Sequence, residues 1–267
     1  MLLVVDVGNT TIVVGLFDGN ELVGNWRLSS RTFTSDEFGI YLMTLFSTMN
    51  ETTNASLPKK DMEKKKKIDG AILASVVPSL DVPISDAVKT YIGVDCVRVD
   101  AFLDLGLEIR YGAPREVGAD RIVNAVGGRH KYGTPLIIVD YGTAITFDVV
   151  SEDGAYLGGV IAPGLVTGVQ TLFSRTAKVP QVGLELPPSV IGRNTNESTQ
   201  SGILHGNAGL TEHLIEKIRA ELGVKAKVIA TGGHAELMAS LVKSIDHVDQ
   251  WLTLDGLRLI YDRNRKN

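Results

Sequence analysis

Apolar residues in the first part of the chain gather in short runs, and residues that favour turns separate these runs. Leu2–Val7 has the pattern of a fully buried strand, although it contains one carboxylate, Asp6. Helical spacing follows, because Phe38, Leu42 and Phe46 recur at i, i+4 and i+8. The elements predicted here are strands at Leu2–Val7, Ile12–Phe17, Glu21–Leu28, Gly70–Val77 and Cys96–Val99, and helices at Ser35–Met49 and Val82–Ile92.

The second half of the chain follows a similar plan. A buried strand again contains one aspartate near its end, in the stretch "LIIVDYGTAIT" that begins at Leu136. A helical stretch opens at Gly118, ahead of this strand. The elements predicted beyond it are strands at Leu136–Val139, Ile145–Val150, Gly159–Ile161 and Lys227–Ala230, and helices at Gly164–Ser174, Ser198–Leu222 and His234–Val242.

The similarity between the halves indicates a duplicated unit. Asp6 and Asp140 are separated by about half the length of the chain, and so are Gly8 and Gly142. Each half is predicted to hold three strands, a helix, a strand, a helix and a strand, which gives two mixed α/β lobes. A cleft between two such lobes is where a ligand is expected.

Composition narrows the class of protein. The chain has 267 residues, of which 44% are hydrophobic and 22% charged, as expected for a globular protein. Its net charge of -4 argues against a general nucleic-acid binder. We expect no signal peptide, no membrane helix and a cytoplasmic location. The lone Cys96 excludes an internal disulfide, and we interpret it as part of the core rather than as a reactive thiol.

A lysine-rich stretch between Thr52 and Lys67 has two interpretations. Its lysines could form an anion-binding patch, or the stretch could be a solvated loop or helix end. Because Asp61, Glu63 and Asp69 are interleaved with the lysines, we favour the solvated loop.

The two strand-end aspartates suggest a function. A carboxylate in an apolar strand is costly unless it is paired or binds a cation. Asp6 alone could merely cap the following turn, but its repetition at Asp140 favours function. The turn amides of Gly8–Thr11 and Gly142–Thr143 can face phosphate oxygens, with cations near the carboxylates. A further glycine turn, Thr231–Gly233, fits an adenosine pocket.

These features predict a phosphoryl-transfer site between two turns. The sequence contains neither a P-loop nor the H-R-D and D-F-G motifs of protein kinases. Asp120 opens a predicted helix, where it could be a plain N-cap paired with Arg121. In a phosphoryl-transfer site, an aspartate in that place could instead accept the proton of an attacking hydroxyl.

The motifs occur together in the order of a known family. They are "DVGNTT" from Asp6, "YGAPREVGADR" from Tyr111, "DYGTAIT" from Asp140, "GRNTNESTQSG" from Gly192 and "TGGHA" from Thr231. This ordered set resembles type III pantothenate kinase, of the acetate and sugar kinase, heat-shock 70 and actin superfamily. The resemblance implies duplicated actin-like (ribonuclease H-like) lobes, each with a mixed five-stranded sheet and helices, and an approximate boundary between residues 1–115 and 116–267.

The resemblance also implies an activity: ATP-dependent phosphorylation of pantothenate to 4'-phosphopantothenate, which begins coenzyme A biosynthesis. It implies Mg²⁺ or another divalent cation, K⁺ or NH₄⁺, and a homodimer with substrate sites near its interface, but no nucleic-acid or membrane partner. By motif, Asp120 is the catalytic base, Asp140 the monovalent-cation ligand and Asp6 a Mg²⁺ contact through water. The implied ATP and phosphate contacts are Asp6, Val7, Gly8, Asn9, Thr10, Thr11, Ile12, Val13, Gly142, Thr143, Gly232 and Gly233. The implied pantothenate contacts are Tyr111, Gly118, Ala119, Asp120, Arg121 and Thr195.

Other functions stay open at this point. The chain could be a kinase or phosphatase of the same superfamily that acts on a sugar or carboxylate. It could also be a nucleotide-binding accessory regulator without turnover, although the retained Asp120 argues against that. An actin-like filament protein is disfavoured because 267 residues leave little room for inserted subdomains.

Overall fold

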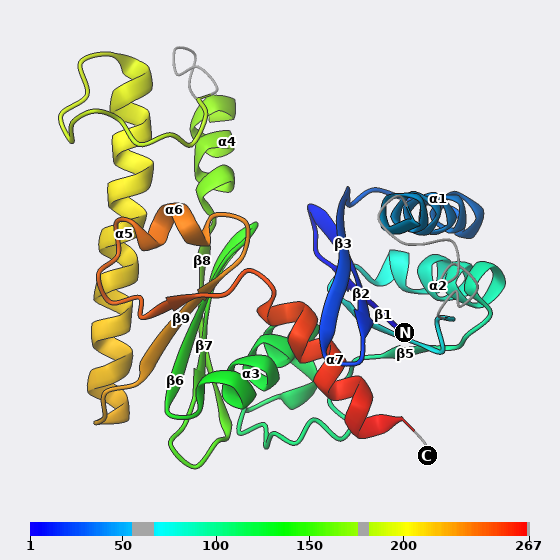
Figure 1. Cartoon of the computed structure of the whole chain (residues 1–267). Coiled ribbons are helices and arrows are strands. Elements are labelled where there is room, and N and C mark those ends of the chain that lie inside the picture. Colours follow the sequence, from blue (N-terminus) through cyan, green and yellow to red (C-terminus); the bar gives the residue numbers. More distant parts are fainter. Residues whose placement is uncertain (55–66, 176–181, 266–267) are drawn as a thin grey trace. The chain divides into compact units, whose positions relative to one another are not determined.

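The computed structural model describes residues 1–54, 67–175 and 182–265, which form two compact units (Figure 1). The described residues of Met1–Gly106, Arg115–Val123 and Thr253–Asn267 make up unit 1. Those of Leu107–Pro114 and Asn124–Leu252 make up unit 2. The lysine-rich stretch that was predicted to be a solvated loop lies mainly outside the described residues.

Unit 1 is built on a five-stranded mixed sheet with the strand order β3-β2-β1-β4-β5. The central strand β1 pairs antiparallel with β2 and parallel with β4. Its elements are β1 (Leu2–Val7), β2 (Thr11–Asp18), β3 (Glu21–Ser29), α1 (Ser35–Asn54), β4 (Gly70–Ser75), α2 (Pro78–Ala87), the π-helical turn η1 (Val88–Ile92), β5 (Cys96–Arg98), the 3₁₀ turn η2 (Pro114–Glu116, at the edge of the unit) and α7 (Leu252–Asn264).

The two faces of this sheet have different coverings. Leu3, Val5 and Val7 point into a core shared with α1 and α2. Because side chains alternate along a strand, Asp6 lies on the opposite face. On that face Gly15 leaves no room for a side chain, since an added Cβ would lie 2.9 Å from Leu254 of α7.

Unit 2 repeats this architecture. Its sheet has the order β10-β9-β6-β7-β8, with β6 antiparallel to β7 and parallel to β9. Its elements are β6 (Leu136–Tyr141), β7 (Ala144–Val150), β8 (Tyr156–Pro163), α4 (Leu165–Arg175), α5 (Thr195–Leu222), β9 (Lys227–Thr231), α6 (Ala235–Ala239) and β10 (His247–Val248), together with most of α3 (Ala119–Tyr132).

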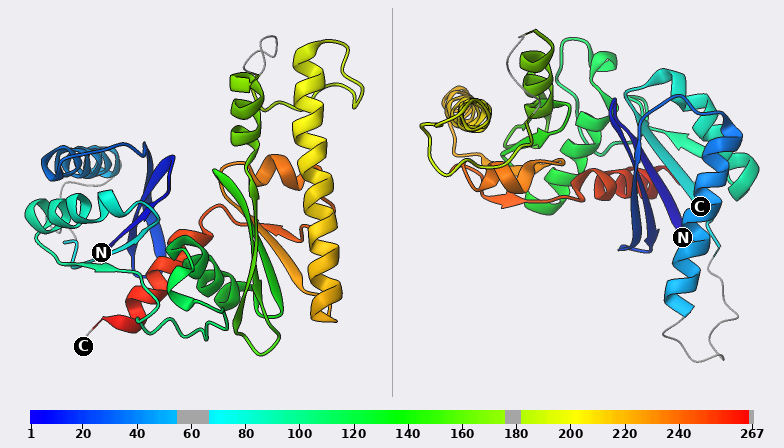
Figure 2. Two further views of the ribbon diagram at one scale, coloured as in Figure 1. Left: turned by 180° about the vertical axis from the view of Figure 1, so that it is seen from behind. Right: turned by 90° about the horizontal axis from the view of Figure 1, so that it is seen from above.

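Helices cover both faces of this second sheet (Figure 2). One face packs against α4, α5 and α6 in a core that includes Ile137, Val139 and Tyr141. The other face packs against α3, where a Cβ added at Gly128 would lie 2.8 Å from Leu136 and 3.0 Å from Ile138. Asp140 alternates with the first set and therefore lies on the α3 face.

The two sheets confirm the predicted duplication. Numbered within each half, both have the order 3-2-1-4-5, with the same parallel and antiparallel pairings. In both halves the strand-end aspartate lies on the face opposite the larger helical core. The ligand cleft that was expected between the lobes stays a prediction.

Several predicted boundaries were wrong by a few residues. The strand from Gly70 ends at Ser75, and the helix predicted from Val82 begins at Pro78, because proline fits the first turn of a helix. The helix predicted from Ser198 begins at Thr195, where the Asn194 side chain accepts a hydrogen bond from the Glu197 amide. The helix predicted at His234–Val242 is only Ala235–Ala239, and the strand predicted at Gly159–Ile161 extends over Tyr156–Pro163.

β10 and α7 were not located in the sequence, and α7 groups with unit 1 although it follows unit 2 in the chain. The domain boundary near residue 115 stays a prediction, since the compact units do not divide the chain at a single point. No helix within the described residues combines the length and the apolar character needed to cross a membrane.

Candidate active site

The first strand-end turn follows β1 in unit 1. The Gly8 amide donates to the Thr11 carbonyl at 3.0 Å, so this amide closes the turn and does not face a ligand. Asn9 and Thr10 form the exposed tip. Val7 and Ile12 have buried side chains, so they can meet a nucleotide only through their backbone. Asp6 is half-buried and is the charged side chain of this turn. Val13 lies opposite Asp6 on the neighbouring strand β2.

Asp120 lies in the same unit, at the start of α3. The chain enters this helix beside the end of β4, because a Cβ added at Gly118 would lie 3.6 Å from Val76. Val76 in turn donates its amide to the Val7 carbonyl at 3.0 Å. Asp120 and the first turn therefore share the carboxyl end of the parallel strands β1 and β4, where ligands bind in α/β sheets.

The local structure weakens the capping interpretation of Asp120. The Gly118 carbonyl accepts the Ile122 amide, so Gly118 is the N-cap residue and Asp120 is already the second helical residue. The Asp120 carboxylate accepts the Arg121 amide at 2.8 Å. It lies over Gly118, where an added Cβ would approach its Oδ1 to 2.5 Å. Glycine is needed at 118 because it leaves the space that this carboxylate occupies.

Burial dominates the electrostatics of Asp120. Desolvation raises the pKa of the Asp120 carboxyl, while the Arg121 amide and the Arg121 charge act in the opposite direction. A carboxylate with a raised pKa is a better proton acceptor than one in water.

The second strand-end turn follows β6 in unit 2. The Gly142 amide donates to the Ala144 carbonyl at 3.0 Å, as Gly8 does to Thr11 in unit 1. The Thr143 side chain is exposed, and its carbonyl accepts the Thr167 hydroxyl at 2.8 Å. The amide of Gly164 reaches the same carbonyl at 3.1 Å. The start of α4 thus fixes the backbone of this turn.

Asp140 is held between two elements of unit 2. Its Oδ2 accepts the side-chain amide of Asn124, at 3.1 Å, from α3. Its Oδ1 lies over the turn after β9, where a Cβ added at Gly232 would approach it to 2.3 Å. The positive φ of Gly232, 92°, also favours glycine there. Gly233 is exposed beside it, whereas Thr231 is buried. The second turn and the glycine turn therefore meet at Asp140.

The remaining predicted pantothenate contacts lie in different places. Arg121 follows Asp120 in unit 1 and is 7% exposed. Ala119 is the first residue of α3. Tyr111 belongs to unit 2, where its ring packs over Gly158 of β8.

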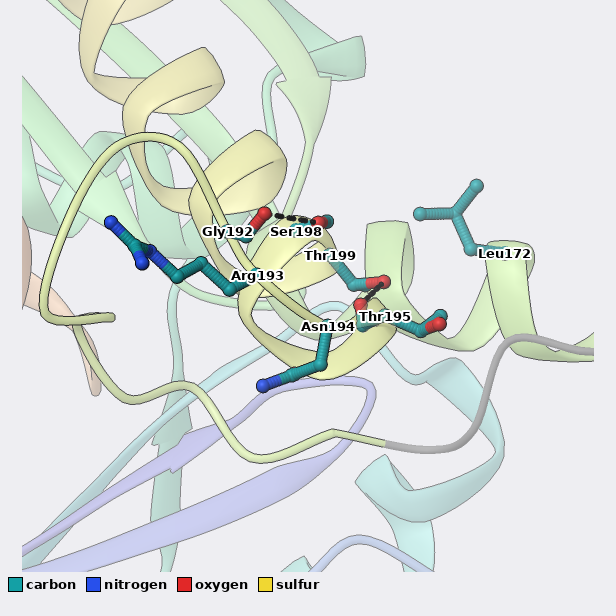
Figure 3. A pocket seen from close by; sticks show the side chains of 7 residues that line it. All are labelled: Leu172, Gly192, Arg193, Asn194, Thr195, Ser198 and Thr199. Atoms are coloured by element: carbon teal, nitrogen blue, oxygen red, sulfur yellow. Dashed lines mark hydrogen bonds between the residues drawn. The ribbon is translucent and has the colours of Figure 1, made fainter.

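Thr195 lies in a pocket of about 610 Å³ in unit 2, between the end of α4 and the start of α5 (Figure 3). The carbonyl of Thr195 accepts the hydroxyl of Thr199 at 2.8 Å. The pocket is lined by Leu172, Gly192, Arg193, Asn194, Thr195, Ser198 and Thr199. The side chain of Thr195 is exposed, as a ligand contact requires.

The oxygen donors present fit the cations that the sequence predicts. Among the described residues, no group of three or more His, Cys, Asp or Glu side chains could hold a metal ion. Mg²⁺ usually keeps several waters and binds through one or two carboxylates and phosphate oxygens, which Asp6 and ATP would supply. A monovalent cation binds oxygen ligands, and the Asp140 carboxylate is orientated by Asn124.

The sequence reasoning missed the residues that support the site. Asn124 is 1% exposed, and a lone polar residue among the apolar Ile122, Val123, Ala125 and Val126 was a signal that could have identified it. Gly164 and Thr167 had no such signal, because their contact with Thr143 depends on the packing of α4. Cys96 packs against the core of unit 1, and burial raises its pKa to about 12, which agrees with its interpretation as a core residue.

The fold belongs to a recognised class. Two five-stranded sheets of the same mixed order define duplicated actin-like lobes. A glucokinase of the ROK family from Streptomyces griseus has a TM-score of 0.55 and 13% identity, covering 100% of this chain and 99% of that one. A conserved Baf family protein from Campylobacter jejuni has a TM-score of 0.61 and 17% identity over 98% of both chains. These similarities show the fold.

Sequence comparison identifies the family within this class. A family model described as type III pantothenate kinase matches residues 2–217. The type III pantothenate kinase of Exiguobacterium sp. is 45% identical over 100% of both chains. That of Moorella thermoacetica is 46% identical over 99% of this chain and 100% of its own. The chain belongs to the type III pantothenate kinase family.

Proposed function

We propose that this protein transfers the γ-phosphoryl group of ATP to the primary hydroxyl of pantothenate, which yields 4'-phosphopantothenate and begins coenzyme A biosynthesis. Full-length identity of about 45% to relatives named type III pantothenate kinase supports the proposal. The observation that carries it is Asp120, a half-buried carboxylate with a raised pKa at the carboxyl ends of β1 and β4, beside the first turn.

Asp120 is the general base in this proposal. The pantothenate hydroxyl is a poor nucleophile at neutral pH until a base accepts its proton. The ionised Asp120 carboxylate takes that proton as the bond to the γ-phosphorus forms and the bond to the leaving ADP oxygen breaks. General-base assistance typically contributes about 10²–10⁴-fold to the rate. The enzyme is therefore a phosphotransferase with an alcohol group as acceptor.

The proposed ATP contacts belong to the first turn of unit 1 and to the second turn and the glycine turn of unit 2. Asn9 and Thr10 form the tip of the first turn, and Thr143 and Gly233 are exposed at the second turn and the glycine turn. Mg²⁺ or another divalent cation, when bound, neutralises charge on the triphosphate, and Asp6 would hold its water ligands. Asp140 would hold K⁺ or NH₄⁺, with Asn124 fixing its orientation.

Pantothenate is recognised by side chains that bear complementary groups. Arg121 offers a guanidinium to substrate oxygens, and Tyr111 and Thr195 offer hydroxyl groups.

A homodimer is part of the proposal, because apolar side chains are exposed around the Thr195 pocket. Val190 is 65% exposed and Ile191 is 82% exposed, and Leu172 and Phe173 of α4 are also exposed. Light scattering should therefore give the mass of a dimer. A cytoplasmic location goes with the proposal, because the single cysteine needs no oxidising compartment.

The test is a coupled assay for ADP release with pantothenate as acceptor, run with potassium and with sodium alone. We expect Mg²⁺-dependent release that requires pantothenate and rises sharply with potassium or ammonium. Release with a sugar or carboxylate instead of pantothenate would assign the chain to another small-molecule kinase. ATP binding without turnover of any acceptor would point to an accessory regulator.

A further inference from the structure

The segment that carries Tyr111 is attached to the edge of the unit 2 sheet. Ile109 forms a parallel bridge with Tyr156, at the start of the edge strand β8. The Tyr156 amide donates to the Glu108 carbonyl, and the Arg110 amide donates to the Tyr156 carbonyl, both at 2.8 Å. These bonds fix the backbone up to the residue that precedes Tyr111.

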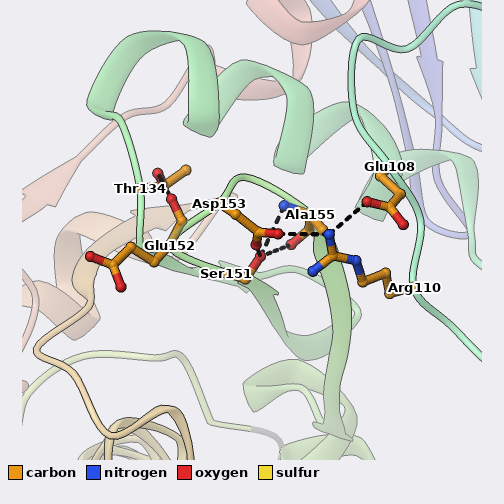
Figure 4. A network of polar contacts seen from close by, with 7 residues as sticks. All are labelled: Glu108, Arg110, Thr134, Ser151, Glu152, Asp153 and Ala155. Atoms are coloured by element: carbon orange, nitrogen blue, oxygen red, sulfur yellow. Dashed lines mark hydrogen bonds and ion pairs between the residues drawn. The ribbon is translucent and has the colours of Figure 1, made fainter.

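The side chain of Arg110 adds a second attachment (Figure 4). Its guanidinium donates to the carboxylates of Glu108 at 2.7 Å and Asp153 at 2.6 Å. Asp153 lies in the turn between β7 and β8, where the hydroxyl of Ser151 donates to its carboxylate. The Ser151 amide also donates to the Ala155 carbonyl at 2.8 Å. The turn is therefore a fixed support for the guanidinium.

The pKa values agree with this attachment. The pKa of the Asp153 carboxyl is lowered, first by the Ser151 hydroxyl and then by Arg110. The pKa of the Glu108 carboxyl is lowered by Arg110. All three charged groups are exposed, so the ion pairs contribute little to the stability of the fold. Their effect is to hold residue 110 in one place.

Gly158 supplies the surface on which the Tyr111 ring lies. A Cβ added there would approach two ring carbons of Tyr111 to 3.0 and 3.1 Å, which is tighter than ordinary contact. The φ of Gly158 is 116°, a conformation that other residues rarely adopt. The ring is thus in close contact on one side, yet Tyr111 remains 38% exposed and available to a ligand.

We propose that Arg110 and Gly158 are positioning residues, which hold the Tyr111 side chain in the orientation that binds pantothenate. The inference rests on the proposed function, in which Tyr111 contacts that substrate. An ordered side chain binds more tightly because its freedom is not lost on binding. That loss typically weakens affinity by about two- to tenfold per side chain.

The test compares Arg110→Ala and Gly158→Ala in the full-length chain. We expect the KM for pantothenate to rise by about two- to tenfold in both variants, with the KM for ATP and kcat nearly unchanged. Combining either substitution with Tyr111→Ala should add little to the effect of Tyr111→Ala alone, because the positioned ring is already gone. A merely structural role would not give this non-additivity.

Two matched controls separate positioning from general damage. Gly223→Ala places a side chain at another glycine of positive φ, 68°, with nothing within 4 Å of the added Cβ. Arg263→Ala removes an exposed ion pair of the same kind, to Asp104. Both controls should keep the wild-type KM for pantothenate. Arg110→Ala keeps the test decisive if Gly158→Ala does not fold.

The outcomes distinguish the inference from the function on which it rests. If the wild type phosphorylates pantothenate but both variants keep its KM, or if their effects add fully to that of Tyr111→Ala, the positioning role is wrong. If the wild type shows no pantothenate-dependent turnover, the proposed function is wrong, and the inference is overturned with it.

Discussion

The two halves of this chain share a topology and differ in the helix that follows their last strand. Both central strands end in an aspartate and a glycine turn, with Asp6 and Asp140 in matching positions. The helix after β5 is α3, whose second residue is Asp120. The helix after β10 is α7, whose second residue is Thr253. The duplication therefore keeps the two turns, and the proposed base is present in one half alone.

The difference follows from what each helix packs against. In α7, Gly256 lies against the backbone of α3, since an added Cβ would approach the Val123 carbonyl oxygen to 2.1 Å. Leu254, Leu257 and Ile260 of α7 are buried. The apolar side of this helix is therefore a packing surface. In α3, the first turn adjoins the ends of β1 and β4, and its carboxylate lies over a glycine. The first turn of α3 can therefore carry the proposed base.

The largest expected effect comes from removing the charge of Asp120. The second residue of α3 is then uncharged, as Thr253 is in α7. Asp120→Asn keeps the side-chain shape and should reduce kcat by about 10²–10⁴-fold, with folding and ATP binding retained. In the wild type, kcat/KM should fall as the pH drops through the raised pKa of Asp120. Rates across Mg²⁺ concentrations provide the control, because recovery at high Mg²⁺ would make Asp120 a metal ligand instead.

A smaller effect should separate the two strand-end aspartates. Asn124→Ala removes the amide that holds Asp140, and loss of such a partner typically weakens metal affinity by about 10–100-fold. The potassium concentration for half-maximal rate should rise accordingly, whereas Asp6→Asn should change the Mg²⁺ response instead. Titrations of both ions on both variants measure this. The same ion response in the two variants would mean that the turns have not diverged.

The substrate side of α3 is tested by Arg121→Lys. A guanidinium can hold two substrate oxygens at once, and a lysine cannot reproduce that geometry. The KM for pantothenate should increase by about tenfold, in line with the loss of one hydrogen bond to a charged group. The KM for ATP should change much less. Unchanged constants would leave Arg121 as a structural residue beside Asp120.

The smallest expected effect concerns stability. Folding raises the pKa of Asp120, so its ionised form is disfavoured in the folded state. This destabilisation is present above the folded pKa and absent below the unfolded pKa. Asp120→Asn should therefore melt at or above the wild-type temperature at about pH 8, and the difference should shrink towards about pH 4. A variant that melts lower at about pH 8 would show that the ionised carboxylate stabilises the fold.

Much of this arrangement could be read from the sequence because it depends on local pattern. Short apolar runs, the turn residues and the repeated D-x-G located the first two strands of each half. The resemblance then supplied the residues of the expected site. α7 was missed because its position depends on packing against Gly15 and Val123, which are distant in sequence. Gly158 was missed for the same reason, since its role appears only when Tyr111 is placed beside it.

The central claim is that this chain phosphorylates pantothenate with Asp120 as the base. The most direct test incubates ATP, Mg²⁺, K⁺ and pantothenate with the wild type and with Asp120→Asn, and identifies the product by phosphorus NMR. The account predicts a phosphate monoester on the primary hydroxyl of pantothenate, formed about 10²–10⁴-fold faster by the wild type. No phosphorylated pantothenate with the wild type, or a rate for Asp120→Asn within about threefold of the wild-type rate, would contradict it.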